Sequence, residues 1–215
     1  MKPGSAKGEI LSKIRNALSK SLPQPYASPD NGHSFYKSSP EIPEIRFAEN
    51  FKDNGGEFIF CMDEAEFLEQ LNELAESKGW RHLFAWEKQL QDLFIKNNFK
   101  KCRIGRGLEK ADAGVTGCEA LIARTGSILL SSRQMEGRGL SIFPPAHVVV
   151  ATVDQIVNDL EDGLRGLREK YPNMPPSLIA LVSGPSQTAD IEKTLVKGAH
   201  GPKEIYLFLI DKAAD

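Results

Sequence analysis

The chain has 215 residues, of which 40% are hydrophobic and 26% charged, and its formal net charge is -2. This length is enough for one full hydrophobic core. The small net charge gives no electrostatic support for nucleic-acid binding. No apolar run approaches the roughly 20 residues that a membrane helix needs, and the N-terminus lacks the apolar core of a secretory signal. We therefore expect a cytoplasmic protein that binds neither nucleic acid nor membranes.

Three cysteines, Cys61, Cys102 and Cys118, are widely spaced along the chain. An odd number of cysteines without paired spacing is typical of a reducing compartment. An iron–sulfur cluster usually takes four cysteine thiolates, and a structural zinc site needs four ligands at regular spacing. We therefore expect no cofactor and no metal, so any redox chemistry in which this protein takes part belongs to a partner.

Residues 1–56 are expected to form an N-terminal helix and an extended arm. The amphipathic pattern of residues 9–20 predicts a helix, which either packs on its own domain or docks on a partner chain. Residues 21–56 contain five prolines and no regular apolar period, which predicts an extended segment. Such an arm either lies over the domain or reaches a second subunit in a homodimer.

Residues 57–215 are expected to form one α/β domain. Short apolar strands alternate with two amphipathic helices, the first capped by Asp63 and ended by Gly79. This alternation favours a mainly parallel sheet with helices on both faces. The expected strands of this part are 58–61, 83–85 and 102–104, and the second helix is 87–97.

The second half of the chain predicts further elements. Residues 114–132 indicate a β-hairpin that turns at Thr125-Gly126. A polar loop over 133–145 leads to a buried strand at 148–150. Beyond it we expect a helix from residue 152 or 154 to 167, a buried strand at 178–182, a helix at about 188–197 and a last strand at 205–210.

Three blocks of this sequence resemble the LutC/YkgG family, also called the lactate-utilisation (LUD) domain. The blocks are GVTGCEALIARTGSILLSS at 114–132, GRGLSIFPPAHVVVA at 137–151 and SGPSQTADIEKTLVKGAHGP at 183–202, and EILSKIRNAL fits the family's first helix. The resemblance implies a NagB/RpiA/CoA-transferase-like fold. It also implies an accessory, cluster-free role beside iron–sulfur proteins that oxidise L-lactate to pyruvate. Many relatives carry an acidic residue where this chain has Arg124, so a role of that carboxylate would be lost or reversed here.

The best candidate for a ligand site is the segment Ser183-Gly184-Pro185-Ser186-Gln187-Thr188. It is predicted to follow a buried strand and to open a helix, where backbone N–H groups favour a phosphate or carboxylate. Asp190 and Glu192, in or near the first turn, would repel such an anion. Plain helix capping by Ser186 or Thr188 is therefore equally well supported.

Other residues are candidates for the same anion site. Arg133 and Arg138 would pair with a carboxylate such as lactate or pyruvate, although a solvated loop arginine is commoner. His147 is either a general base or a hydrogen-bonded structural histidine. His200, beside Gly201, either reaches the site or caps the preceding helix.

The alternative is a small-molecule enzyme of the NagB/RpiA/CoA-transferase-like type that acts on a sugar phosphate or an acyl-CoA. A CoA-transferase usually needs a glutamate at a strand end, for which Glu119 is the candidate. Cys118 is expected to be buried and inert. Gly105-Arg106-Gly107 lacks the complete dinucleotide-binding pattern and favours a turn. No acid–base set is complete, so the sequence favours the accessory role.

Overall fold

The computed structural model describes residues 6–19, 41–103, 107–133, 139–191 and 194–211. The chain divides into two compact units, Met1–Ser39 and Pro40–Asp215. The first unit contains helix α1 (Ala6–Leu18), which confirms the predicted N-terminal helix. Ile10 and Ile14 of α1 are exposed. Within the described part of the chain, no helix combines the length and the apolar character needed to cross a membrane.

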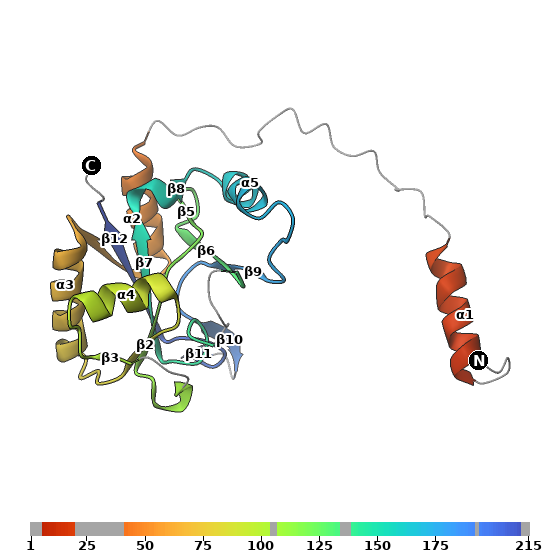
Figure 1. The fold of residues 1–215 in the computed structure, drawn as a ribbon, viewed down its shortest axis with the longest axis horizontal. Coiled ribbons are helices and arrows are strands. Elements are labelled where there is room, and N and C mark those ends of the chain that lie inside the picture. Colours follow the sequence, from red (N-terminus) through yellow and green to blue (C-terminus); the bar gives the residue numbers. More distant parts are fainter. Residues whose placement is uncertain (1–5, 20–40, 104–106, 134–138, 192–193, 212–215) are drawn as a thin grey trace. The chain divides into compact units, whose positions relative to one another are not determined.

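A six-stranded sheet, sheet A, forms the centre of the second unit (Figure 1). All of its neighbouring strands are parallel, so the predicted mainly parallel sheet is confirmed. The strands are strongly apolar because the sheet is covered on both faces. Their order is β1 (Glu57–Cys61), β12 (Glu204–Ile210), β7 (Ala146–Thr152), β4 (Ala113–Thr116), β2 (Leu83–Ala85) and β3 (Cys102–Arg103).

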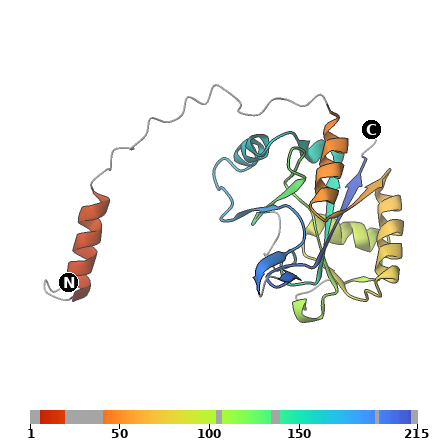
Figure 2. The ribbon, with the colours of Figure 1, turned by 180° about the vertical axis from the view of Figure 1, so that it is seen from behind.

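The two faces of sheet A are covered differently (Figures 1 and 2). On one face α3 (Glu64–Ser77) and α4 (Lys88–Lys96) pack into the core through buried residues such as Phe67 and Phe94. The other face packs against α2 (Pro43–Asp53) and a second sheet. Asp63 begins α3 as predicted, because its side chain accepts a hydrogen bond of 2.8 Å from the backbone N–H of Glu66.

The second sheet, sheet B, has four strands in the order β8 (Ile156–Val157), β5 (Ala120–Ile122), β6 (Ser127–Ser131) and β9 (Ile179–Val182). Strands β5 and β6 are antiparallel and form the predicted hairpin. Gly126 occupies the turn with φ +59°, a conformation that favours glycine. Helix α5 (Leu160–Lys170) covers the outer face of sheet B, where Leu167 packs with Ile122 and Leu129.

Helix α2 corrects the expectation that all of residues 21–56 form an extended arm. Pro43 stands at the start of the helix, where its missing N–H costs nothing and its fixed φ suits the first turn. Phe47 and Phe51, four residues apart on one helical face, are both fully buried. Residues 20–40 lie outside the described part of the chain, so a homodimer formed through an arm stays a prediction.

The expected helix at 188–197 is also wrong. The segment forms a two-stranded antiparallel hairpin of β10 (Gln187–Ile191) and β11 (Thr194–Lys197). Short apolar runs fit a helix and a strand equally well in sequence, and β-branched residues favour the strand.

In the second half of the chain, strands β8 and β9 also differ from the elements that the sequence predicts. Ile156 and Val157 form strand β8 beside β5, preceded by a 3-10 turn (Val153–Gln155), so the following helix begins only at Leu160. The run at 178–182, expected to be a buried strand, forms β9 at the edge of sheet B, antiparallel to β6. Ile179 and Leu181 are therefore each 43% exposed. A further 3-10 turn (Leu108–Lys110) precedes β4.

Candidate functional site

A cavity of about 530 Å³ lies at the carboxyl ends of the sheet A strands. Its lining includes the ends of β7 and β12, the residues that follow β2 and β4, and one side of α5. In α/β proteins ligands bind beyond the carboxyl ends of parallel strands, and a cavity of this volume suits a small-molecule ligand. This cavity is therefore the candidate functional site.

Glu87 is the acidic residue of the cavity lining that has a raised pKa. It follows β2 by two residues, and its Oε1 accepts a hydrogen bond of 2.9 Å from the backbone N–H of Gly117. The pKa of Glu87 is raised to about 7, chiefly by burial and also by the nearby Glu119 carboxylate, while the Gly117 hydrogen bond and the Lys170 charge act in the opposite direction. Glu87 thus exchanges a proton near neutral pH, which is a property of many functional carboxyl groups.

Glu119, which also lines the cavity, is held by three side chains. Its side chain is 2% exposed, and the Nζ of Lys170 lies 2.8 Å from its Oε2. Ser131 and Tyr171 both donate hydrogen bonds to its Oε1, at 2.5 and 3.1 Å. Burial lowers the pKa of Lys170, but the bond to Glu119 raises it overall, so the ammonium keeps its proton. Glu119 therefore joins the end of α5 to the hairpin.

Cys118, which precedes Glu119 in the chain, also lines the cavity. The Nε2 of Gln155 donates a hydrogen bond of 2.5 Å to the Cys118 carbonyl oxygen, which fixes the backbone here. Cys118 is fully buried, as predicted. Burial raises the pKa of its thiol far above the usual range, so the side chain stays a protonated thiol.

The segment 183–188, predicted as an anion site, is not part of the cavity lining. It connects the edge strand β9 to β10. Ser183 Oγ lies 2.7 Å from Ser127 Oγ, and the backbone N–H of Ser186 donates to the Pro202 carbonyl oxygen at 2.9 Å. Gly184, with φ +131°, approaches α2 so closely that an added Cβ would lie 2.3 Å from the Asn54 carbonyl oxygen.

Gln187 and Thr188 begin a strand and not a helix, so the argument from a helix N-terminus does not apply to this segment. The structure does bring the residues around His200 next to it, because an added Cβ on Gly201 would lie 3.2 Å from the Cβ of Ser186. His200 itself is exposed in the turn between β11 and β12. Anion binding at 183–188 and His200 stays a prediction.

The remaining candidates take separate places. His147 is fully buried in β7, and its Nε2 lies 2.8 Å from Thr116 Oγ1, while its Nδ1 has no hydrogen-bond partner among the described residues. Burial lowers the pKa of His147 to about 4, so the imidazole is neutral at physiological pH. Arg133 is exposed, and its Nε and Nη2 donate to the Met174 carbonyl oxygen at 3.1 and 2.9 Å. Arg138 lies outside the described residues.

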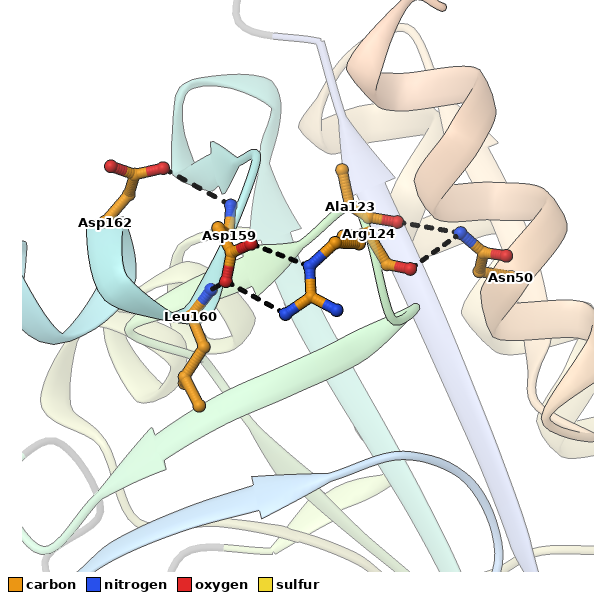
Figure 3. Close-up of polar contacts among 6 residues, drawn as sticks. All are labelled: Asn50, Ala123, Arg124, Asp159, Leu160 and Asp162. Carbon is orange, nitrogen blue, oxygen red and sulfur yellow. Dashed lines mark hydrogen bonds and ion pairs between the residues drawn. The ribbon is translucent and has the colours of Figure 1, made fainter. Parts of the chain in front are cut away.

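Arg124 forms a two-point ion pair with Asp159 (Figure 3). Its Nε lies 2.6 Å from Oδ2 and its Nη2 lies 3.0 Å from Oδ1. Asp159 also caps α5 by accepting a hydrogen bond of 2.6 Å from the N–H of Leu160. On the other side, the Asn50 side chain donates to the carbonyl oxygens of Ala123 and Arg124, at 2.9 and 3.3 Å. Arg124 thus connects the hairpin turn to α5, and this position holds a structural cation here.

We expect Asp159→Ala to lower the free energy of unfolding by about 1–2 kcal/mol, because it removes a helix cap and a partly buried ion pair. Asp159→Asn should cost less, because asparagine also caps helices. The Arg124 guanidinium holds the pKa of Asp159 below its ordinary value of 3.8. The pair therefore stabilises the fold fully above that value and loses its effect as the pH falls further. Urea titrations between pH 3 and 7 measure this; an unchanged acid profile in Asp159→Asn would contradict it.

Only some of the residues that line the cavity are candidates from the sequence alone. Cys118 and Glu119 were named from the sequence, whereas Glu87, Gln155 and Lys170 were missed. The available signal for Glu87 was its place directly after a predicted strand. Within the described residues, no three His, Cys, Asp or Glu side chains gather in a way that could hold a metal ion.

The sequence profile of the LUD domain family matches residues 45–210. The chain belongs to the LUD domain family. A similar fold is seen in the crystal structure of a DUF162 family protein from Deinococcus radiodurans, with a TM-score of 0.56 and 21% identity over 78% of this chain and 96% of that one. That likeness supports the fold.

Curated relatives of this LUD domain protein extend the comparison. An uncharacterized protein of Neisseria meningitidis is 30% identical over 165 residues, which are 71% of this chain and 70% of that protein. Lactate utilization protein C of Deinococcus radiodurans is 36% identical over 104 residues, 48% of each chain. Lactate utilization protein C of Bacillus subtilis is 34% identical over 107 residues, 48% of this chain and 45% of that one. The matched part thus spans about half the length of these two proteins.

Proposed function

We propose that this protein is an accessory component of bacterial L-lactate utilisation and acts in the cytoplasm beside iron–sulfur proteins that oxidise L-lactate to pyruvate. The observation that carries the proposal is its membership of the LUD domain family, together with relatives that are named lactate utilization protein C. Because the matches to those relatives cover about half of their length, the role of the whole relative comes to this chain as part of the proposal.

The positions of the three cysteines support the proposal that a partner protein, and not this chain, carries out the redox chemistry. Cys61 and Cys102 lie on β1 and β3, which are the two opposite edges of sheet A, and Cys118 follows β4. Burial raises the pKa of Cys61 to about 11 and that of Cys102 to about 12. Iron–sulfur clusters are held by neighbouring thiolates, and these three thiols are neither neighbours nor easily ionised.

A small-molecule enzyme is the second candidate, because the cavity and the proton exchange of Glu87 near neutral pH favour a ligand site. Its expected substrates, a sugar phosphate or an acyl-CoA, are anionic. Five acidic residues line the cavity with the single lysine Lys170 among the described residues. The resulting negative potential disfavours phosphate groups, so the accessory role is the better supported of the two.

Deletion of the gene from its host tests the proposal. We expect the deletion strain to lose growth on L-lactate while its growth on pyruvate is unchanged, because the defect precedes pyruvate. A plasmid copy should restore growth, and affinity purification of the tagged protein under anaerobic conditions should recover iron–sulfur proteins. Normal growth on L-lactate would contradict the role, and recovery without any iron–sulfur protein would contradict the partners.

A further inference from the structure

We propose that the cavity at the carboxyl end of sheet A binds a ligand through a cationic group, an ammonium or a guanidinium, that lies against the carboxylate of Glu87. The inference is independent of the proposed role in lactate utilisation, which assigns no ligand to this cavity. Three observations support it: the hydrogen bonding of Glu87, the charges of the other lining residues, and a glycine of α5 that lines the cavity.

Glu87 has no direct ion pair within the described part of the chain; the positive charge that acts on it is that of Lys170, whose ammonium is bonded to Glu119. The Oε1 of Glu87 accepts the hydrogen bond from Gly117 N–H, and among the described residues no basic side chain forms an ion pair with it. A half-buried carboxylate without a direct ion pair is costly. A ligand cation in the cavity would supply that ion pair, and it would keep Glu87 ionised.

The other lining residues favour the same sign of ligand. Lys170 is the basic side chain among the described lining residues, and its ammonium is already bonded to Glu119 at 2.8 Å. The remaining charged residues of the lining are all acidic: Glu64, Asp154 and Asp162. Like charges inside a concave, partly buried site repel strongly, so a carboxylate or phosphate ligand is disfavoured and a cation is attracted.

A glycine on α5 leaves one side of the cavity without a side chain. Gly166 lies inside the helix and lines the cavity, although glycine destabilises a helix interior relative to alanine. An added Cβ at Gly166 would meet nothing within 4 Å, whereas one at Gly163 would lie 3.0 Å from Ile122 Cδ1. Packing within the protein therefore explains Gly163, whereas Gly166 is exposed at the cavity and has no packing role; a glycine here leaves room for a ligand beside α5.

Three probes of equal length distinguish the ligand classes: 1,4-diaminobutane, 1,4-butanediol and succinate. We expect calorimetry at pH 8 to detect the diamine only, with L-lactate as silent as succinate. Glu119, Lys170 and the Gly117 N–H face Glu87, and Lys170 keeps its proton. Because Glu87 must be ionised to bind a cation, the affinity for the diamine should rise about tenfold from pH 6 to pH 8.

Glu87→Gln should weaken diamine binding at least about tenfold and remove its pH dependence, because the amide oxygen still accepts the Gly117 hydrogen bond but carries no charge. Glu73→Gln, an identical change at an exposed residue of α3 outside the cavity lining, is the matched control and should bind like the wild type. Gly166→Leu, which fills open space, should also weaken binding while thermal unfolding shows a folded protein. Binding of succinate or L-lactate that depends on Glu87, or diamine binding that is absent or unchanged in Glu87→Gln, would overturn the inference.

Discussion

Replacement of Gly126 by alanine should lower the free energy of unfolding by about 3 kcal/mol or more. An added Cβ would lie 2.3 Å from the backbone N of Phe51 and 2.4 Å from the carbonyl carbon of Asn50. Both are backbone atoms of α2, so the clash can be relieved only if the hairpin turn moves away from the helix. That movement would break the hydrogen bond of 2.8 Å from the Asn54 side chain to the Thr125 carbonyl oxygen. Urea denaturation measures the loss.

Gly79→Ala is the matched control for this variant. Gly79 has a φ of +71°, close to the +59° of Gly126, but an added Cβ there would meet nothing within 4 Å. We expect a loss of only about 1 kcal/mol, which is the cost of the left-handed conformation for alanine. The difference between the two variants isolates the close approach of the hairpin to α2. Equal losses would mean that this approach contributes nothing.

Phe51→Ala should cost about 3–5 kcal/mol, in the range that truncation of a buried phenylalanine usually costs. The ring is fully buried and stacks on Phe47 with a centroid distance of 5.5 Å. It also fills the space beside Gly56, where an added Cβ would lie 2.4 Å from its Cζ. Chemical denaturation of the full-length protein measures the change.

Ile45→Ala on the same helix provides the comparison. Ile45 is 54% exposed, so its truncation removes little buried apolar surface and should cost less than about 1 kcal/mol. If Phe51→Ala proved as stable as Ile45→Ala, α2 would contribute nothing to the core. The segment would then behave as the extended arm that its prolines predict.

Local signals in the sequence were enough to place much of the fold. Asp63 and Gly79 bound α3 as predicted, because a cap and a left-handed glycine act on their immediate neighbours. The hairpin turn at Gly126 follows from the same kind of local requirement. The apolar runs at 83–85 and 205–210 form buried strands of sheet A, since a continuous apolar run needs cover on both faces.

The candidate site was only partly accessible from the sequence. The sequence indicates Glu119 as the candidate glutamate at a strand end and Cys118 as one of the three cysteines. Glu87 lies more than 60 residues before Gln155 and more than 80 before Lys170, and nothing local indicates that the three line one cavity. The segment 183–188 was favoured instead because a helix was expected after it, and β10 stands there.

The sequence by itself determined the kind of protein: a parallel α/β domain of the LUD family, with the strands, caps and turns that short-range sterics and hydrophobicity specify. The tertiary structure decided which sheet each strand joins, and with it the place of the site. Strands β7 and β9 are similar apolar runs in sequence, yet one is central in sheet A and the other is the exposed edge of sheet B. The sheet that each strand joins depends on packing with side chains far away in the chain, such as Phe47 and Phe51 of α2, which share one core cluster with residues of both sheets. Such long-range packing leaves no periodic signal in the sequence of the strand that it positions.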